Sequence, residues 1–378
     1  MMNFDFNEEQ LELRDLIREF VDREITPIAL EMDHNDKMHP ELCGKLAELG
    51  LLDLVVPEEY GGTGFDSITL AMIYEELGRG CGGVATVVAA NALASYPIIL
   101  IGTPEQKEYW FNFLKGGSLA AFALTEPNAG SDAGGVSTRA VKEDDKYILN
   151  GTKTFITNGG QADVYLIFAN TRKSGGIRGL TCFIVHKDTP GFKIGKKEDK
   201  MGIRASSTCE LILEDVVVHE NMRVGKEGEG FRIAMSTLDS SRPFVGAVSV
   251  GIAEHALNLA VKYSKERRQF DQPISSFQMV QAMLADMAMK VETSRLMVYK
   301  ACFMRDQGRD FTKEAAMSKC YASDVAMSVS TDAVQIMGGY GYMKEYPAEK
   351  LMRDAKIMQI YEGSNQIQRS VIANKILF

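Results

Sequence analysis

The spacing of apolar residues changes twice along this chain, and this change restricts the fold more than any other feature. In residues 1–120 apolar side chains recur every three or four positions, as in LELRDLIREF, which predicts helices. In residues 121–229 runs such as VYLIFA, LTCFIV and CELILEDVVV are separated by turns rich in glycine and lysine, which predicts strands. Long helical faces return in residues 230–378. The sequence therefore predicts an α+β multidomain chain: a helical N-terminal domain, a middle antiparallel β-barrel or sandwich, and a C-terminal helical bundle.

Two short signals predict local backbone structure. Asn7, with Gln10 three residues later, predicts a capped helix start. Asn150-Gly151 lies in the middle of KYILNGTKTFIT, whose alternation on both sides predicts a β-hairpin that turns at this dipeptide.

Composition excludes several classes of protein. The 378 residues suffice for two or three domains, and 42 basic against 51 acidic residues give a formal charge of −9. Such an acidic chain is a poor binder of nucleic acid or of anionic membrane surfaces. The richest apolar run, GGVATVVAANALASYPIILIG, is interrupted by Asn91, Ser95 and Pro97, so we expect no membrane insertion. The first residues show no signal-like pattern, and we expect a cytoplasmic protein of bacterial type, or a mitochondrial matrix protein if the chain is a processed eukaryotic form.

The cysteines and histidines show no metal-binding pattern. Six cysteines are scattered without a Cys-x-x-Cys pair, which is typical of reduced thiols inside a cell. The five histidines never fall at the spacing of metal ligands, and we expect no metal site. The chain also lacks a GxSxG motif and a Walker A loop.

One stretch near the C-terminus, AKIMQIYEGSNQIQRS, raises a question of charge. Glu362 follows a largely apolar run and precedes Gly363, and a carboxylate among apolar side chains loses hydration, which disfavours its charged form. It is either tuned for proton transfer or a solvent-facing residue at the end of a helix that Gly363 stops. Taken alone the stretch favours the second interpretation, but motifs elsewhere in the chain reverse this.

Five longer motifs resemble, in this order, the acyl-CoA dehydrogenase family of flavoproteins. They are AFALTEPNAGSDAGG, NGTKTFITNGGQAD, KMGIRASST, ERRQFDQPISSFQ and QIMGGYGYMKEYPAEKLMRDAKIMQIYEGSNQIQR. The resemblance covers essentially the whole chain, and the last motif is long and specific. It implies a helical N-terminal domain, a middle β domain, a C-terminal four-helix bundle, bound FAD and a homotetramer.

The reaction of this family gives Glu362 a role. Its members remove an α-proton from an acyl thioester while the β-hydrogen leaves as hydride for the flavin, so a base must face the substrate opposite the cofactor. Glu362 matches the base position of the short- and medium-chain members. Some relatives place their glutamate just before the arginine of LDxxR, where this chain has Ser241. The resemblance therefore implies that Glu362 is the catalytic base, with its backbone N–H and a ribityl hydroxyl of FAD as donors to the thioester oxygen.

The resemblance also implies which residues bind cofactor and substrate. For FAD these are Phe122, Leu124, Thr125, Phe155, Thr157, Arg268, Phe270, Gln278, Gln335, Gly338, Gly339, Ser364 and Gln366. For the acyl-CoA substrate they are Ser131, Asp239, Arg242, Tyr361 and Gly363. In relatives the counterparts of Arg268, Phe270 and Gln278 hold a neighbouring subunit's FAD, so the cofactor would be shared within the tetramer.

Plainer explanations exist for some of these residues. A helix stop explains Gly338-Gly339 equally well, and a surface pair on one helix explains Asp239 and Arg242. Phe155 stands where tryptophan is common in the family, which keeps an aromatic wall but alters its width.

The acyl group and the direction of reaction stay open. The pocket floor is expected from VVAANALASYPII and RPFVGAVSVG, which contain no lysine or arginine other than Arg242, so a dicarboxylic substrate is disfavoured. Aliphatic, branched, cyclic and aryl-propionyl thioesters all remain candidates. The expected redox partner is an electron-transfer flavoprotein, and with it the same site could run in reverse as an enoyl-CoA reductase. A longer acyl-CoA oxidase, a nucleic-acid-binding relative and a non-enzymatic FAD scaffold fit the sequence less well.

Overall fold

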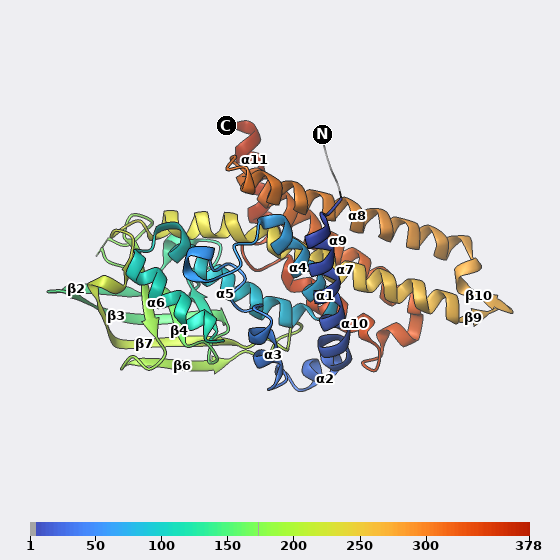
Figure 1. Cartoon of the computed structure of the whole chain (residues 1–378), viewed down its shortest axis with the longest axis horizontal. Helices are drawn as coiled ribbons and strands as arrows, with labels where there is room; N and C mark the ends of the chain where they lie inside the picture. The colour runs from blue at the N-terminus through green and yellow to red at the C-terminus, as the bar shows by residue number, and fades with distance from the viewer. Residues whose placement is uncertain (1–4, 173) are drawn as a thin grey trace.

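The structure is a computed structural model that describes residues 5–172 and 174–378. A sheet occupies one end of the elongated molecule, and long helices extend to the other end (Figure 1). The N-terminal helices are α1 (Glu8–Phe20), α2 (Ala29–His34), α3 (Leu42–Glu48), α4 (Ser67–Gly80), α5 (Gly82–Ile101) and α6 (Pro104–Lys115). The predicted cap of α1 is confirmed, because the Asn7 side chain accepts from the Gln10 backbone N–H at 2.8 Å and the Gln10 side chain accepts in return at 3.1 Å.

The apolar run of α5 is not interrupted, contrary to our expectation. The helix continues through Pro97, and the two polar residues find partners inside the fold: the Asn91 amide donates to Leu52 O at 3.0 Å, and the Ser95 hydroxyl donates to Asn91 O at 2.7 Å. Among the described residues, α5 and the later helix α7 (Gly230–Glu266) are long and apolar enough to cross a membrane by length and composition. Most of each apolar window, 72% and 67%, is buried within the fold, as in core helices.

The middle of the chain forms one eight-stranded sheet. Its strands are β1 (Ala120–Ala123), β2 (Arg139–Glu143), β3 (Lys146–Thr157), β4 (Val164–Asn170), β5 (Leu180–His186), β6 (Phe192–Lys197), β7 (Thr208–His219) and β8 (Arg223–Val224). The order is β6-β7-β3-β2-β4-β5-β8, and β1 pairs with β4 off this path. The sheet is mixed rather than purely antiparallel, because β1 and β2 both run parallel to β4. Every residue of β4 is buried, which suits a strand covered on both faces.

The predicted hairpin at Asn150-Gly151 is wrong. Both residues lie inside β3, which is continuous, and the chain turns instead between β2 and β3 at Asp144, whose φ is 53°. Asn150 and Asp215 exchange two hydrogen bonds of 2.9 Å across to β7, and the register shifts there as a bulge. A Cβ on Gly151 would lie 2.5 Å from Oγ1 of Thr138, so close packing explains this glycine.

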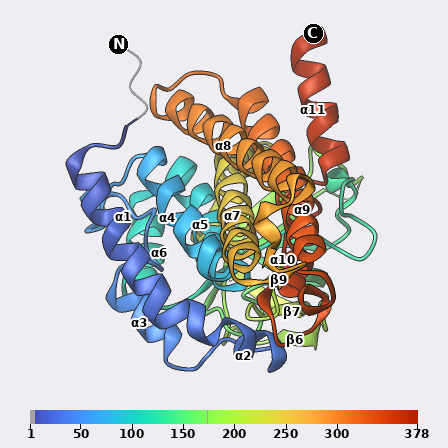
Figure 2. The ribbon, with the colours of Figure 1, turned by 90° about the vertical axis from the view of Figure 1, so that its right-hand side faces the viewer.

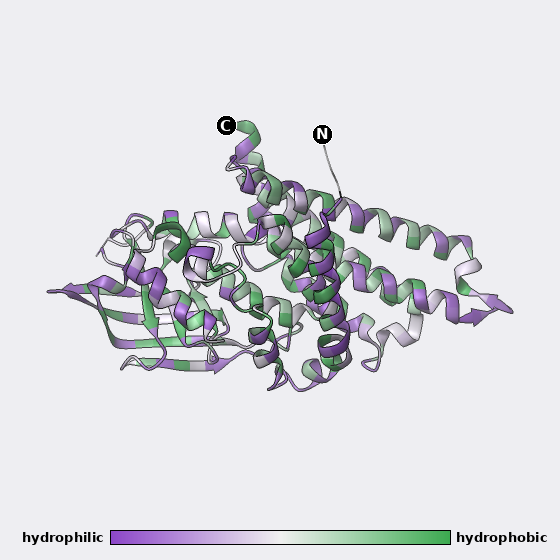
Figure 3. Ribbon diagram, viewed as in Figure 1, coloured by the Kyte–Doolittle hydropathy of each residue, from purple (hydrophilic) through white to green (hydrophobic). Residues whose placement is uncertain are grey.

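The C-terminal part is a bundle of long helices. They are α7 (Gly230–Glu266), α8 (Gln278–Asp306), α9 (Thr312–Met337), α10 (Pro347–Met358) and α11 (Asn365–Leu377), and the hairpin of β9 (Arg268–Gln269) and β10 (Gln272–Pro273) joins α7 to α8. Helices α7, α8 and α9 pack on one another, and α10 packs on α7 and α9. The end of α11 extends beyond the bundle (Figure 2). Figure 3 shows that the strands of the hairpin at the tip are hydrophilic.

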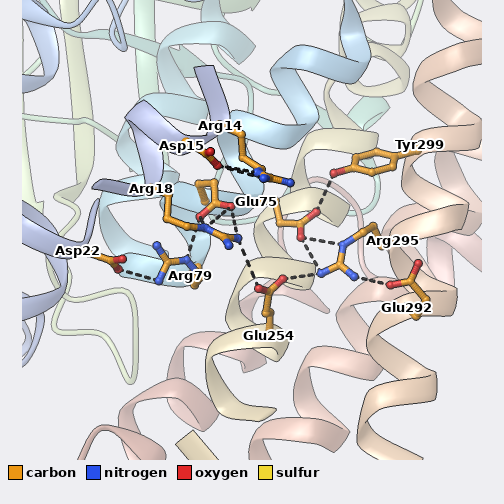
Figure 4. A network of polar contacts seen from close by, with 11 residues as sticks. Arg14, Asp15, Arg18, Asp22, Glu75, Arg79, Glu254, Glu292, Arg295 and Tyr299 are labelled. Atoms are coloured by element: carbon orange, nitrogen blue, oxygen red, sulfur yellow. Dashed lines mark hydrogen bonds and ion pairs between the residues drawn. The ribbon is translucent and has the colours of Figure 1, made fainter. Parts of the chain in front are cut away.

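A polar network joins the N-terminal helices to the bundle (Figure 4). Arg18 of α1 binds Glu76 of α4 at 2.5 Å, and Glu75 of α4 binds Arg295 of α8 at 2.8 Å. Arg295 also lies 2.5 Å from Glu254 of α7. The network therefore fixes α4 against α7, and these two helices also supply side chains to the candidate site.

Candidate active site

Glu362 lies in a turn between two helices rather than at the end of one. Helix α10 ends at Met358 and α11 begins at Asn365, capped by Ser364. Glu362 and Gly363 both adopt left-handed backbone, with φ of 53° and 92°. This region is unfavourable for a residue with a Cβ, and such strain gathers at functional sites. The helix-end interpretation of Glu362 is therefore wrong, because Gly363 does not stop α10.

Side chains from α7 and α9 act on the Glu362 carboxylate, which is half-buried. The Ser241 hydroxyl donates a hydrogen bond to Oε2 of Glu362. Burial raises the pKa of Glu362, while this hydrogen bond and the positive charges of Lys319 and Arg242 oppose the rise. The result is a carboxylate that accepts a proton more readily than an exposed one.

The buried Arg242 forms an ion pair with the half-buried Asp239 beside the Glu362 turn. Arg242 is 4% exposed, and its Nη1 lies 2.5 Å from Oδ1 of Asp239. A Cβ on Gly363 would lie 3.7 Å from Nη2 of Arg242, so the guanidinium reaches the turn closely. Among the described residues its Nε–H has no partner, which leaves one buried donor for a ligand. The two residues are thus not a surface pair, and their role toward CoA stays a prediction.

An aromatic cluster from α4, α5 and α7 lies within electrostatic reach of Glu362. The Phe244 ring centroid is 5.2 Å from that of Tyr74 and 6.4 Å from that of Tyr96. Burial raises the pKa of both tyrosines, that of Tyr96 to about 12, and the Glu362 charge contributes to each rise. In the part of the chain that the structure describes, neither hydroxyl makes a hydrogen bond of ordinary geometry. Arg305 of α8 lies 5.0 Å from the Tyr96 ring centroid. Helix α8 lies outside the predicted pocket stretches, so it adds a cation besides Arg242.

The predicted flavin residues of the β domain gather where β1 ends and β3 bulges. The backbone N–H of Thr154 donates to Thr125 O at 2.9 Å and joins the two segments. Phe155 has φ of 57° and is 64% exposed, at a register shift of β3 against β7. An exposed ring on a strained backbone fits the wall of a flat cofactor. The other residues of this group are Phe122 in β1, Leu124 just after it, and Thr157 at the end of β3.

A second group of predicted FAD residues lies at the far end of the bundle. Phe270 turns the β9–β10 hairpin with φ of 50° and is 87% exposed. Gly338, with φ of 60°, and Gly339 have open space where a Cβ would be. Both glycines line a cavity of about 560 Å³ together with Gln269 of the hairpin, so the structure brings these two motifs together. Arg268, Gln278 and Gln335, from the same segments, are exposed. In Figure 1 this hairpin and the sheet lie at opposite ends of the molecule.

The remaining predicted residues are placed as follows. Ser131 is exposed in the loop after β1, and Gln366 is exposed in the first turn of α11. Tyr361 precedes Glu362, and its hydroxyl donates to Sδ of Met358 at 2.9 Å. Sequence reasoning missed the contact of Ser241 with Glu362, although LDSSR marked this position as the alternative site for a base. It also missed Lys319, for which the sequence carries no signal.

Comparison with known proteins agrees with this arrangement. The N-terminal, middle and C-terminal domains of acyl-CoA dehydrogenases match residues 7–117, 121–216 and 228–377. The structure superposes on butyryl-CoA dehydrogenase from Megasphaera elsdenii with a TM-score of 0.97 and 47% identity, over 100% of both chains. It matches equally well, with a TM-score of 0.97 and 49% identity over 100% of both chains, a chain solved in work on the electron transferring flavoprotein of Acidaminococcus fermentans. An acryloyl-CoA reductase (NADH) of Anaerotignum propionicum is 47% identical, over 100% of this chain and 96% of its own.

The chain therefore belongs to the acyl-CoA dehydrogenase family, and it is a flavin-dependent oxidoreductase. The helical, sheet and helical parts correspond in order to the three domains of the family, as the resemblance implied.

Proposed function

We propose that the protein dehydrogenates a short- to medium-length or compact acyl-CoA to the 2-enoyl-CoA, with Glu362 as the base. The observation that carries this proposal is the half-buried Glu362 carboxylate, held in a left-handed turn and hydrogen-bonded to Ser241. The α-proton of a thioester is only weakly acidic, so its removal needs a base with a raised proton affinity in a partly dry site. Burial supplies that raised pKa at Glu362.

FAD is the proposed cofactor, and the residues present fit it. When bound, it supplies the acceptor for the hydride that leaves the β-carbon. Phe155, Thr125 and Thr157 would hold the flavin ring, and the open glycines Gly338 and Gly339 would let a pyrophosphate approach the backbone. Ser364 and Gln366, at the start of α11, would complete these contacts.

The separation of the two FAD groups supports a homotetramer with shared cofactors. Phe155 lies near the end of β3 in the sheet domain, whereas Phe270 turns the β9–β10 hairpin, which lies at the far end of the long helices from the sheet (Figure 1). This placement favours a hairpin whose Arg268 and Phe270 serve the FAD of a neighbouring subunit. A monomer would then bind FAD poorly.

The proposed substrate is an acyl-CoA with a short or compact chain. Tyr74, Tyr96 and Phe244 form a bulky aromatic cluster within electrostatic reach of Glu362, which favours a short or compact acyl group. The similarity to a butyryl-CoA dehydrogenase agrees with this size. A cyclic or aryl-propionyl thioester is the alternative within the same class.

The direction of the reaction has a second candidate. The relative named acryloyl-CoA reductase favours an enoyl-CoA reductase, which is the same chemistry in reverse. In either direction we propose an electron-transfer flavoprotein as the redox partner, since the similar chain from Acidaminococcus fermentans was solved in work on such a protein. The bacterial origin of these relatives supports a cytoplasmic location.

An anaerobic titration tests this proposal. The purified holoprotein is mixed with butyryl-, hexanoyl-, octanoyl-, isobutyryl-, cyclohexanecarboxyl- and glutaryl-CoA, and the absorbance of the oxidised flavin is followed. We expect rapid bleaching by butyryl-CoA or another compact acyl-CoA. Bleaching by glutaryl-CoA would contradict the expectation that dicarboxylic substrates are disfavoured, and no bleaching by any member of the panel would contradict the dehydrogenase assignment.

A further inference from the structure

Lys319 is a fully buried ammonium that no carboxylate neutralises directly. It lies in α9, is 0% exposed, and has no ion pair within 4 Å in the described part of the chain. Its Nζ donates to Gly363 O at 2.8 Å and to Oδ1 of Asn365 at 3.0 Å. A buried charge is costly unless it is compensated, so this placement calls for an explanation.

The other buried lysines show how unusual this is. Lys153 lies 2.7 Å from Glu126, and Lys350 lies 2.6 Å from Asp354. Both cations therefore have a carboxylate in direct contact, whereas Lys319 contacts only neutral oxygens.

The turn that carries Glu362 is held by this lysine and its neighbours. Glu362 and Gly363 have left-handed backbone, which persists only where surrounding contacts determine it. The Gly363 carbonyl accepts from Lys319 and also, at 2.9 Å, from the buried Gln368. The Asn365 amide in turn donates to Ser323 of α9 at 2.9 Å.

We propose that Lys319 is a positioning residue for the catalytic base: it fixes the Gly363 carbonyl and faces the Glu362 carboxylate with a buried positive charge. The proposal rests on the function proposed above. Its ammonium takes no part in proton transfer. It keeps the carboxylate in place and in its ionised form, ready for the α-proton.

Several polar and charged groups on the helices packed around Glu362 act on the pKa of its carboxyl. Burial raises the pKa of Glu362, and the Ser241 hydrogen bond, Lys319 and then Arg242 lower it. The phenols Tyr74, Tyr96 and Tyr361 stay neutral, because burial raises the pKa of each above its ordinary value.

Lys319 has charged neighbours of its own. Burial lowers its pKa to about 8; Glu362, Cys320 and Asp324 oppose this change, and Arg242 adds to it. Below about pH 8 the wild-type lysine is therefore charged and stabilises the Glu362 carboxylate; above that pH it loses its proton and the effect fades. Removal of the charge should thus shift the acid limb of the reaction to higher pH.

The test compares the holoenzymes of wild type, Lys319→Met, Lys319→Gln and a control, Lys356→Met. Lys356 is an exposed lysine of α10 that donates to Oε1 of Gln359 at 3.0 Å, in the chain leading to the same turn. Anaerobic flavin reduction by the best acyl-CoA is measured from about pH 5.5 to about pH 9.5, with flavin content, acyl-CoA affinity and thermal unfolding measured alongside. Lys319→Gln keeps a donor without a charge, in case the methionine variant does not fold.

We expect both neutral variants to retain flavin and to bind acyl-CoA, with the acid limb shifted upward by about one pH unit. The rate should fall about tenfold near pH 6 and much less near pH 9, while the control matches wild type. An acid limb unchanged from wild type would overturn the proposal, and so would loss of fold or flavin in both variants, since Lys319 would then be merely structural. Failure of the wild type to be reduced by any acyl-CoA would instead refute the proposed function.

Discussion

The buried pair of Glu126 and Lys153 offers a quantitative test of how the proposed flavin site is held. Lys153 of β3 lies 2.7 Å from Oε1 of Glu126 and 3.1 Å from Leu124 O. Glu126 also accepts hydrogen bonds from backbone and hydroxyl groups of Ser137 and Thr138. The pair therefore fixes the segment that contains Thr125 behind the exposed ring of Phe155.

The expected cost of breaking this pair follows from its burial. Pairing with Lys153 and the hydroxyl donors outweigh burial and lower the pKa of Glu126 to about 2, whereas burial lowers the pKa of Lys153 to about 8. The attraction within the pair therefore offsets the cost of burying both charges, so the intact pair is a weak source of net stability. Glu126→Gln leaves the Lys153 ammonium buried without an anion, which typically costs about 3–5 kcal/mol.

The stability that Glu126 contributes should be lost at low pH. The pKa of Glu126 is lower in the folded than in the unfolded protein, so its contribution to stability is complete above about pH 4.5 and is lost as the pH falls toward about 2. Glu126→Gln should lack this acid-dependent loss.

Denaturant unfolding and flavin content measure these effects. A matched control is Glu214→Gln, which breaks the exposed Lys193–Glu214 pair of 2.5 Å on β6 and β7 and should change stability by less than about 0.5 kcal/mol. Adding Lys153→Met to Glu126→Gln should recover part of the loss, with a coupling of about 2 kcal/mol or more. A Glu126→Gln protein as stable and as yellow as the control would refute the reasoning.

Three further predictions concern the turn, the hairpin and a helix start. Gly363→Ala should lower both flavin reduction and stability, the latter by about 1–3 kcal/mol, because φ is 92° and a Cβ would lie 2.6 Å from Nε2 of Gln368; unchanged kinetics would contradict the role of the turn. Phe270→Ala should leave the monomer fold intact but reduce flavin retention and tetramer content on gel filtration, since the ring is 87% exposed in one chain; full retention of both would refute a shared cofactor. Asn7→Ala should cost about 1 kcal/mol in unfolding free energy through loss of the capping box with Gln10, without any change in flavin content.

Local signals in the sequence predicted much of the fold. The capping box at Asn7 needs only neighbours three residues apart, and the helix from Glu8 to Phe20 follows from the apolar spacing of LELRDLIREF. The change of period near residue 121 marks the sheet for the same reason. By contrast, Asn150-Gly151 has the chemistry of a tight turn, but Asn150 bonds to Asp215, 65 residues later in the sequence, and Gly151 packs closely against Thr138. Pairing with distant strands overrode the local preference there.

In the candidate site, too, some residues were predictable from the sequence and others were not. Glu362 was predicted as the base because the motif around it resembles that of a known family, whereas its apolar neighbours taken alone favoured a solvent-facing residue. The contacts that tune it, from Ser241 and Lys319, come 121 residues earlier and from the middle of another helix, and no spacing rule connects them to the turn. Arg242 and Asp239 show the opposite error, because their spacing suits an exposed pair, whereas Arg242 is buried and Asp239 is half-buried.

The most direct test of the account is rapid-mixing anaerobic reduction of Glu362→Gln by the acyl-CoA that bleaches the wild type. The control is Glu345→Gln, an exposed carboxylate outside the turn. We expect the Glu362 variant to retain flavin and bind acyl-CoA, yet to be reduced about 10²–10⁴ times more slowly, whereas the control behaves as wild type. Reduction of Glu362→Gln at the wild-type rate would contradict the assignment of Glu362 as the base.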